Sequence, residues 1–300
     1  MNSYQNQNNM KLAIEWFLNP DHLPIIIDQE KGFLKAKGID DFELIVPSNH
    51  YDGLQYLIDG NIDLATNEPL HLIEQYNPEF LSLGSYFETK GGVTMKKSSF
   101  EALKEGKTIR VATPVSNHKT NCICLEIIKR YAQKQEVNIR PSQIEFIAKD
   151  FYLIKHIKEG ADAAWLYFYN FEGVEAEHEG LELIHMDADT ACFANFCALD
   201  LFTSQTFYKK SPKKVKSFVE AIQKAIEFIE THPEEAFQIY YAYTDEESSP
   251  LMDDILKTTA ECFHKNFESS SKKELPILKY FKDIGITDLS EDQFKNAFLN

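Results

Sequence analysis

Short runs of alternating apolar and polar residues are followed by stretches with helical spacing through the first two thirds of the chain. Residues 10–14 alternate and predict a β-strand, while residues 25–38 carry apolar side chains at helical spacing and predict a helix ending at Gly38. The same pattern predicts strands at 42–46, 62–65, 81–87, 93–96, 108–112, 143–148 and 161–166, and helices at 51–59, from Leu70, at 120–133 and at 151–159. This alternation is typical of a mostly parallel sheet flanked by helices.

The pattern changes near the start of the last third. Residues 196–202 predict one more strand, and residues 233–241 and several later segments predict helices. Residues 212–231 predict a long amphipathic helix whose apolar face comprises Val215, Phe218, Val219, Ile222, Ile226 and Ile229. We therefore expect an α/β protein with two lobes, each a mostly parallel sheet flanked by helices, in which residues 10–95 start lobe 1, residues 96–190 form lobe 2 and residues 191–300 return to lobe 1.

Two short segments, about one hundred residues apart, resemble each other. Residues 57–65 and 157–164 both have the pattern of a helix end, a glycine, an acidic residue and a buried strand. The similarity favours two lobes built on one plan.

The composition is that of a well-packed globular protein, with 43% hydrophobic and 13% aromatic residues among 300. The net charge is −16, and the one cluster of lysines lies at 209–214, which argues against binding to nucleic acid or to an anionic membrane. No apolar run reaches the roughly 18 residues of a membrane span, so we expect no membrane insertion.

The first residues and the cysteines bear on the compartment. Residues 1–9 have neither the basic start nor the apolar core of a signal peptide, so we expect a cytoplasmic protein; a periplasmic or surface-tethered protein whose signal has been removed is the alternative. Five cysteines are an odd number, which also favours a reducing compartment. Cys192 and Cys197 have poor spacing for zinc, so we expect no metal and expect the cysteines to be small buried residues.

Polar and aromatic residues lie where strands of the first lobe end. Trp16, Asn19 and His22 stand between the first predicted strand and helix, and Asn67 and Glu68 follow the strand predicted at 62–65. Ligands of open α/β sheets bind outside the carboxyl ends of strands, so these five are candidate ligand-binding residues. The alternative is a strand-to-helix turn with a buried tryptophan.

Aromatic and polar residues recur after the strand predicted at 161–166. A ligand bound at this strand end would meet aromatic faces for stacking and polar groups for hydrogen bonds. The candidates for these roles are Tyr167, Tyr169, Asn170 and Glu172. For Trp165 and Phe168 we expect core packing, and a solvated helix start is the alternative for Glu172.

The loop before the helix predicted at 120–133 is a candidate anion site. Ser116, Asn117 and His118 lie at the start of that helix, where backbone N–H groups, with Lys119 and Thr120, suit a phosphate or a carboxylate. No glycine-rich loop is present, and ordinary N-capping by serine or asparagine is the alternative.

Several of these segments together resemble one protein family. The segments are 16–22, 30–33 and 60–65, with weaker similarity at 211–218 and 232–236. Over residues 10–240 the chain resembles the type II substrate-binding proteins that include the pyrimidine-binding proteins of thiamine-precursor importers and the histidine-consuming thiamine-pyrimidine synthases. The resemblance implies a two-lobed periplasmic-binding-protein type II fold.

The resemblance to the binding proteins implies a small pyrimidine-like ligand in the cleft between the lobes and no cofactor. Trp16 and either Tyr167 or Tyr169 would clamp the ring, and Glu172 would accept a hydrogen bond from its exocyclic amine. Asn19 and Asn170 would orient the ring. An ABC permease would be the partner of an exported protein.

The resemblance to the synthases implies a different function, the synthesis of hydroxymethylpyrimidine phosphate with pyridoxal phosphate, histidine and iron. His71 matches the histidine that donates its ring atoms and would be catalytic. Asn67 matches the lysine that holds pyridoxal phosphate, but an asparagine cannot form an imine. At the place of the cysteine-rich iron site this chain has two cysteines, Cys192 and Cys197, and the Ser116 region replaces the phosphate loop that contains glycine.

Overall fold

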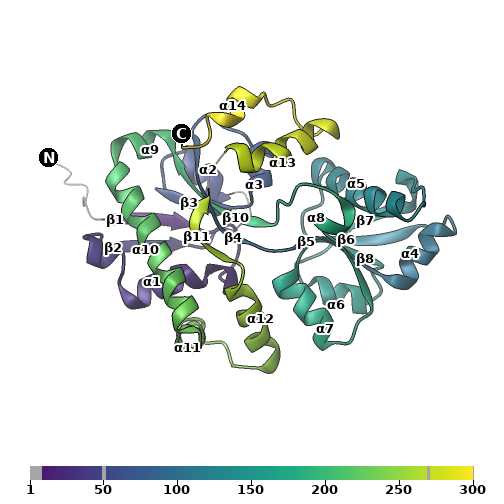
Figure 1. Ribbon diagram of the computed structural model, residues 1–300, viewed down its shortest axis with the longest axis horizontal. Helices are drawn as coiled ribbons and strands as arrows, with labels where there is room; N and C mark the ends of the chain where they lie inside the picture. Colours follow the sequence, from purple (N-terminus) through teal and green to yellow (C-terminus); the bar gives the residue numbers. More distant parts are fainter. Residues whose placement is uncertain (1–8, 49–51, 269–270, 300) are drawn as a thin grey trace. The chain divides into compact units, whose positions relative to one another are not determined.

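The computed structural model describes residues 9–48, 52–268 and 271–299 (Figure 1). The chain divides into two compact units. Unit 1 comprises Met1–Glu88, Ala198–Glu274 and Ser290–Asn300, and unit 2 comprises Thr89–Cys197 and Leu275–Leu289. Each described unit is a sheet flanked by helices, as the alternating pattern predicts.

Unit 1 contains a six-stranded sheet with the order β11-β4-β10-β3-β1-β2. Its strands are β1 (Asn9–Ala13), β2 (Asp41–Ile45), β3 (Leu64–Asn67), β4 (Phe80–Glu88), β10 (Ala198–Ser204) and β11 (Phe263–Glu268). β1 is parallel to both of its neighbours, so that Leu12 lies opposite Leu44 on one side and Leu64 on the other. The carboxyl ends of β1 and β3 therefore lie next to each other.

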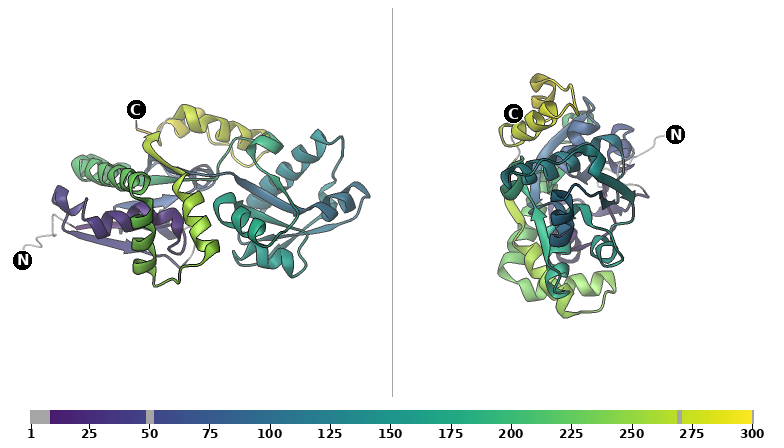
Figure 2. Two further views of the ribbon diagram at one scale, coloured as in Figure 1. Left: turned by 60° about the horizontal axis from the view of Figure 1, so that its bottom comes forward. Right: turned by 90° about the vertical axis from the view of Figure 1, so that its right-hand side faces the viewer.

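The helices of unit 1 include one that the sequence predicts with its full bounds, α10 (Pro212–Thr231). Its apolar face is buried as expected except for Val219, which is half-buried. Phe218 stacks on Phe42 of β2 with ring centroids 5.8 Å apart. α10 lies beside α1 and α11 (Figure 2). The other helices of the unit are α1 (Leu23–Lys31), α2 (Asp52–Ile58), α3 (Pro69–Glu74), α9 (Gln205–Lys210), α11 (Pro233–Thr244), α12 (Pro250–Ala260) and α14 (Glu291–Lys295).

Unit 2 contains a five-stranded sheet with the order β7-β6-β8-β5-β9. Its strands are β5 (Gly91–Lys96), β6 (Ile109–Thr113), β7 (Ile144–Ala148), β8 (Ala163–Phe168) and β9 (Leu183–Met186). Its helices are α4 (Lys97–Lys104), α5 (His118–Lys134), α6 (Leu153–Lys158), α7 (Val174–His178), α8 (Ala188–Ala191) and most of α13 (Ser271–Asp283). Leu153, Ile154 and Ile157 of α6 form a buried cluster with Ala164 and Tyr167 of β8.

No helix in the described parts of either unit has the length and apolarity needed to cross a membrane.

Both sheets are mixed, which corrects the expectation of mostly parallel sheets. β10 runs antiparallel to β3 and β4, and β5 runs antiparallel to β8 and β9. β4 takes the chain out of unit 1 and β10 brings it back, so the two pair like the arms of a hairpin although unit 2 lies between them in the sequence. The alternation of residues along a strand shows which face is buried but not the direction in which the strand runs. The antiparallel direction of β10 and β5 could therefore not be predicted from the sequence.

The internal similarity between residues 57–65 and 157–164 corresponds to a repeated structural detail. Asp63 precedes β3, and its carboxylate accepts the backbone N–H of Lys11 on β1 at 2.9 Å. Asp162 precedes β8, and its carboxylate accepts the backbone N–H of Arg110 at the start of β6 at 2.8 Å. An aspartate at the equivalent position therefore links a pair of parallel strands in each unit. In this respect β1 and β3 of unit 1 correspond to β6 and β8 of unit 2.

The unit boundaries differ from the expected lobe boundaries. The chain changes unit at 88/89 and 197/198, where β4 ends and β10 begins, and not at 95/96 and 190/191. Residues 275–289 were expected to return to lobe 1, but they belong to unit 2. There Tyr280 packs on Phe193 and Phe281 packs on Phe196, with ring centroids 6.2 Å apart in both pairs. These aromatic contacts over long sequence distances decide where the segment belongs.

The first helix is shorter than predicted. α1 ends at Gly32, which adopts a left-handed φ of +66°, and Gly38 ends a separate 3-10 turn. The carboxylate of Asp28 accepts the backbone N–H of Leu34 at 2.8 Å and so holds the chain after the helix. Asp28 is buried, and burial raises the pKa of its carboxyl to about 6 in spite of the hydrogen bond from Leu34.

We expect Asp28→Asn to stabilise the protein at neutral pH. The folded-state pKa lies above the unfolded value, so the carboxyl favours folding at low pH and loses this contribution as the pH rises through about 6. An asparagine can still accept the bond from Leu34 and cannot ionise, so the gain should be about 1–2 kcal/mol near pH 7.5 and absent near pH 3, below the unfolded-state pKa of 3.8. Urea unfolding at both pH values measures the difference. An equal effect at both would show that ionisation of Asp28 is not responsible.

Candidate functional site

A buried polar network holds the turn after β1 in unit 1. The ring of His22 is fully buried; its Nδ1 accepts the backbone N–H of Asn19 at 3.2 Å and its Nε2 faces Glu15 Oε1 at 3.0 Å. The second oxygen of Glu15 accepts the hydroxyl of Thr66 on β3. Burial raises the pKa of Glu15, but His22 and Thr66 outweigh it and hold this pKa below its ordinary value. The network therefore ties the turn to the neighbouring strand.

Trp16 and Asn19 have different surroundings in this turn. Asn19 is buried, and its side-chain oxygen caps the turn that follows by accepting the backbone N–H of Asp21 at 2.9 Å. Trp16 is half-buried and lies against the exposed ring of Phe17, with ring centroids 5.5 Å apart. Trp16 therefore keeps ring surface that a ligand can reach, whereas His22 can act only by positioning the turn.

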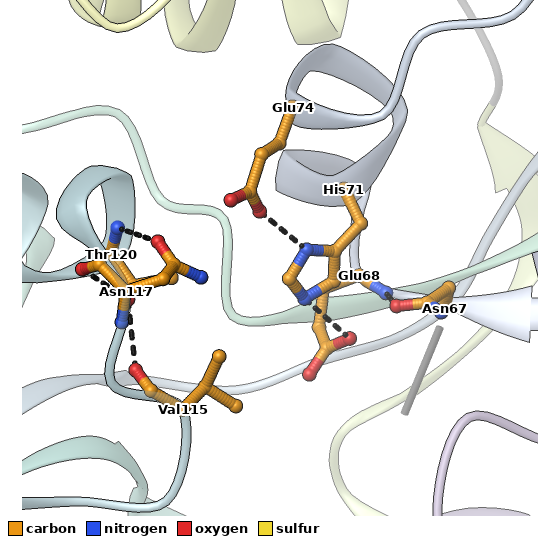
Figure 3. A network of polar contacts seen from close by, with 7 residues as sticks. All are labelled: Asn67, Glu68, His71, Glu74, Val115, Asn117 and Thr120. Atoms are coloured by element: carbon orange, nitrogen blue, oxygen red, sulfur yellow. Dashed lines mark hydrogen bonds and ion pairs between the residues drawn. The ribbon is translucent and has the colours of Figure 1, made fainter. Parts of the chain in front are cut away.

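The residues after β3 surround a buried histidine (Figure 3). His71 on α3 is almost fully buried, with Nδ1 3.0 Å from Glu74 Oε2 and Nε2 3.5 Å from Glu68 Oε2. Asn67 is also buried, and its side-chain oxygen accepts the backbone N–H of Glu68 at 2.9 Å. The three sequence candidates Asn67, Glu68 and His71 are thus close together, with both ring nitrogens of His71 near carboxylates.

In unit 2, the loop after β6 has the geometry of a helix cap. The side chain of Asn117 accepts the backbone N–H of Thr120 at 2.9 Å, and the hydroxyl of Thr120 donates to the carbonyl of Val115 at 2.8 Å (Figure 3). Ser116 and His118 are exposed beside it. The capping interpretation of Asn117 is therefore confirmed, and anion binding by the loop stays a prediction.

β8 contains a β-bulge just before the second group of candidates. Leu166 has no partner on β5 and adopts a φ of +65°, a conformation that leucine rarely takes. The expected core packing of Trp165 is confirmed by its full burial and its edge contact with Phe196. Tyr167 is also fully buried and stacks on His185, with ring centroids 5.0 Å apart. Tyr169 is thus the tyrosine of this strand end with accessible ring surface.

The segment after β8 forms a single π-helical turn, Tyr169–Gly173. Such turns insert one extra residue into a helix and are frequent at functional sites. Tyr169 is half-buried and its hydroxyl donates to Glu177 Oε1, while Asn170 is completely buried within the turn. Glu172 is half-buried, and its Oε2 accepts the backbone N–H of Phe168 at 2.8 Å.

The carboxyl of Glu172 is the most perturbed acid of this region. Burial raises its pKa to about 8, although hydrogen bonds from the backbone N–H groups of Phe168 and of Glu172 itself act in the opposite direction. The side chain is therefore mainly a neutral carboxylic acid at pH 7, with one O–H donor and one carbonyl acceptor. A neutral acid at a strand end is typical of a functional site.

In each unit the candidates come from the carboxyl ends of two adjacent parallel strands. These are β1 and β3 in unit 1, and β6 and β8 in unit 2. This is the edge at which ligands bind in open α/β sheets.

Comparisons with known proteins identify the family. The profile of the NMT1/THI5-like family matches residues 19–236. The chain belongs to this family. Among the relatives of this NMT1/THI5-like protein is the 4-amino-5-hydroxymethyl-2-methylpyrimidine phosphate synthase THI5 of Saccharomyces cerevisiae, 25% identical over 81% of this chain and 74% of the relative. A putative thiamine biosynthesis protein of Haemophilus influenzae is 23% identical over 82% of this chain and 77% of the relative.

Solved structures with the same fold confirm the expected type II periplasmic-binding-protein fold of this NMT1/THI5-like protein. The alkanesulfonate-binding protein SsuA of Xanthomonas axonopodis superposes with a TM-score of 0.68 at 10% identity, over 97% of this chain and 98% of the other. The nitrate-binding protein NrtA of Synechocystis superposes with a TM-score of 0.66 at 16% identity, over 96% and 84% of the two chains.

The side chains of this NMT1/THI5-like protein do not fit the cofactors of the synthases. Pyridoxal phosphate held as an imine needs a lysine amine, and Asn67 offers only an amide. Among the described residues, no group of three or more His, Cys, Asp or Glu side chains is placed to hold a metal ion. Cys124 and Cys197 are buried as expected, whereas Cys122 and Cys262 are half-buried. Cys192, which ends α8 with a left-handed φ of +52°, is exposed, so the expectation that every cysteine is buried is wrong.

Glu15, Thr66 and His185 are parts of these sites that the sequence reasoning missed. Glu15 and Thr66 meet only because β1 and β3 pair. The Nδ1 of His185 on β9 lies 3.2 Å from the hydroxyl of Thr94 on β5, and the strand β9 itself was not predicted. No local sequence pattern distinguishes these residues.

Proposed function

We propose that this NMT1/THI5-like protein binds an aminopyrimidine of the thiamine-precursor type, and that Glu172 recognises it as a neutral acid. Membership of the family supports a thiamine-related pyrimidine, since relatives are named for 4-amino-5-hydroxymethyl-2-methylpyrimidine phosphate. A binding role is favoured over synthesis because Asn67 has no amine for pyridoxal phosphate.

The raised pKa of Glu172, to about 8, is the observation on which the proposal rests. The edge of a 4-aminopyrimidine presents a ring nitrogen that accepts and an amine that donates. A neutral carboxyl has the complementary pair, an O–H that donates and a carbonyl that accepts. Glu172 Oε2 already accepts from Phe168, so Oε2 suits the carbonyl role and the proton suits Oε1. A carboxylate would leave the ring nitrogen without a donor.

Aromatic rings beside these candidates supply the stacking that a flat ligand needs. Tyr169 is three residues before Glu172 in the π-helical turn of unit 2 and keeps exposed ring surface. In unit 1, Trp16 is half-buried and Phe17 is exposed. Aromatic stacking adds about 0.5–1.5 kcal/mol per pair to the burial of the rings.

The pH dependence of binding tests the role of Glu172. For the wild type, we expect the affinity for 4-amino-5-hydroxymethyl-2-methylpyrimidine to be constant below a pH of about 8 and to fall up to about tenfold per pH unit above it, because the ligand binds the protonated acid. Glu172→Gln keeps one donor and one acceptor and cannot ionise, so its affinity should stay within about threefold of the wild type near pH 7 and should not fall above pH 8. Isothermal titration calorimetry measures both profiles.

Glu172→Ala is the matched control: a bound pyrimidine then lacks both partners, so the affinity should be about tenfold or more below that of the wild type under pH 8 and should not change with pH above it. A wild-type affinity that rises with pH would show that the carboxylate is the binding form. An absence of binding at any pH would contradict the pyrimidine as ligand.

A further inference from the structure

The ring of Tyr169 is held from several sides, and all of the contacts lie in unit 2. Its hydroxyl donates to Glu177 Oε1 on α7 at 2.5 Å. Its ring meets the ring of His185 on β9 nearly at a right angle, with centroids 6.0 Å apart and an interplanar angle of 87°. Its backbone N–H donates to the carbonyl of Lys90 at 2.8 Å. Contacts therefore hold the hydroxyl of Tyr169, one side of its ring and its backbone N–H.

Gly173 leaves the space in which this ring lies. A Cβ atom at this position would come within 2.8 Å of both Cγ and Cε2 of Tyr169, closer than carbon atoms approach without displacement. The backbone of Gly173 is ordinary, with φ −66° and ψ −48°, which any residue adopts. Backbone conformation therefore does not require the glycine, and the proximity of the Tyr169 ring does.

His185 is itself held in place. Its ring stacks on the buried ring of Tyr167 at 5.0 Å with an interplanar angle of 24°, and its Nδ1 lies 3.2 Å from the hydroxyl of Thr94. The contacts to Tyr169 thus come from the π-helical turn, from α7 and from β9, so movement of the ring would require several elements to move.

We propose that Gly173, Glu177 and His185 are positioning residues that fix the ring of Tyr169 before a ligand arrives, and that this ring is the stacking surface by which unit 2 selects a flat ring. The proposal rests on the proposed function, whose pyrimidine supplies such a ring. A ring fixed in advance loses little conformational entropy on binding, so its order contributes to affinity and not only to folding.

A double-mutant cycle separates this role from general damage to the fold. We expect Gly173→Ala to weaken binding of 4-amino-5-hydroxymethyl-2-methylpyrimidine about tenfold, and Tyr169→Ala to weaken it by at least as much. In the Tyr169→Ala background, Gly173→Ala should have almost no further effect, because the ring that it displaces is absent. Equal losses in both backgrounds would overturn the proposal.

Conservative variants test the positioning roles of Glu177 and His185. Glu177→Gln retains an acceptor for the Tyr169 hydroxyl and should bind like the wild type, whereas Glu177→Ala should bind several-fold more weakly. His185→Phe retains an aromatic ring and should bind better than His185→Gln, which retains only a partner for Thr94. Tyr152→Phe is the control and should bind like the wild type, because Tyr152 is exposed and takes no part in the contacts that hold Tyr169.

Ring mobility in the free protein gives a readout that does not depend on any ligand. With ring-labelled tyrosine, NMR relaxation should show an ordered Tyr169 ring in the wild type and a more mobile one in Gly173→Ala, with the exposed ring of Tyr152 as the internal reference. A wild-type Tyr169 as mobile as Tyr152 would overturn the proposal whether or not the pyrimidine binds. An ordered ring together with no pyrimidine binding would instead contradict the proposed function and support the fixation of the ring.

Discussion

His22→Ala should destabilise the protein by about 3–5 kcal/mol, because it leaves the buried carboxylate of Glu15 without its partner. Glu15 and His22 are 5% and 0% exposed, so solvent does not replace the lost contact. The substitution also removes the acceptor for the backbone N–H of Asn19. Urea unfolding near neutral pH measures the loss of unfolding free energy.

Two comparisons connect this loss to the charge of Glu15. In His22→Ala, burial raises the pKa of Glu15 because His22 no longer opposes it. The loss of unfolding free energy should therefore become smaller as the pH falls from about 7 to 5. The double variant Glu15→Gln with His22→Ala should be more stable than His22→Ala alone by about 1–2 kcal/mol, since it contains no buried charge. A loss below about 1 kcal/mol for His22→Ala would show that the network does not hold the turn.

Gly92→Ala should destabilise unit 2 by about 3–5 kcal/mol, through backbone strain and a steric clash together. Gly92 has a φ of +136°, which residues with a side chain rarely adopt, and an added Cβ would lie 2.6 Å from the carbonyl oxygen of Met186. β5 is bonded to β8 on one side and to β9 on the other, so it has no free direction in which to move. Thermal and urea unfolding measure the effect.

Gly180→Ala is the matched control in the same unit. Gly180 also has a positive φ, +63°, but an added Cβ would have no atom within 4 Å. Gly180→Ala should therefore lower the free energy of unfolding through backbone strain alone, by about 1–2 kcal/mol. Similar losses for Gly92→Ala and Gly180→Ala would show that the close approach of Met186 contributes nothing.

Local pattern predicted the elements whose burial follows their own periodicity. α10 has the predicted bounds because Pro212 opens it and one continuous apolar face runs along it. β9 and β11 were missed, since each is a short edge strand whose order comes from pairing with β5 or β4. α1 was predicted too long because a glycine stands at both 32 and 38. The pattern does not show that the α-helix already ends at Gly32 and that Gly38 ends a separate turn.

Features of the candidate sites were likewise predictable where they depend on nearby residues and not where they depend on packing. Asn117 was recognisable as a helix cap because its partner Thr120 is three residues away. The neutral state of Glu172 could not be read from the sequence, since it depends on burial of the carboxyl in the folded protein. The choice between Tyr167 and Tyr169 depended on the bulge at Leu166, after which Tyr167 is fully buried and Tyr169 is not.

Spacing along the chain is enough to predict the alternation of strands and helices, the family, and the strand ends at which the candidate residues stand. These features depend on residues a few positions apart, whose spacing is visible in a single chain. Long-range contacts in the folded protein set the direction of β5 and β10, the unit to which residues 275–289 belong, and the partners of Glu15 and His185. These features are set by packing and desolvation between residues far apart in the chain, and neither has a local signature.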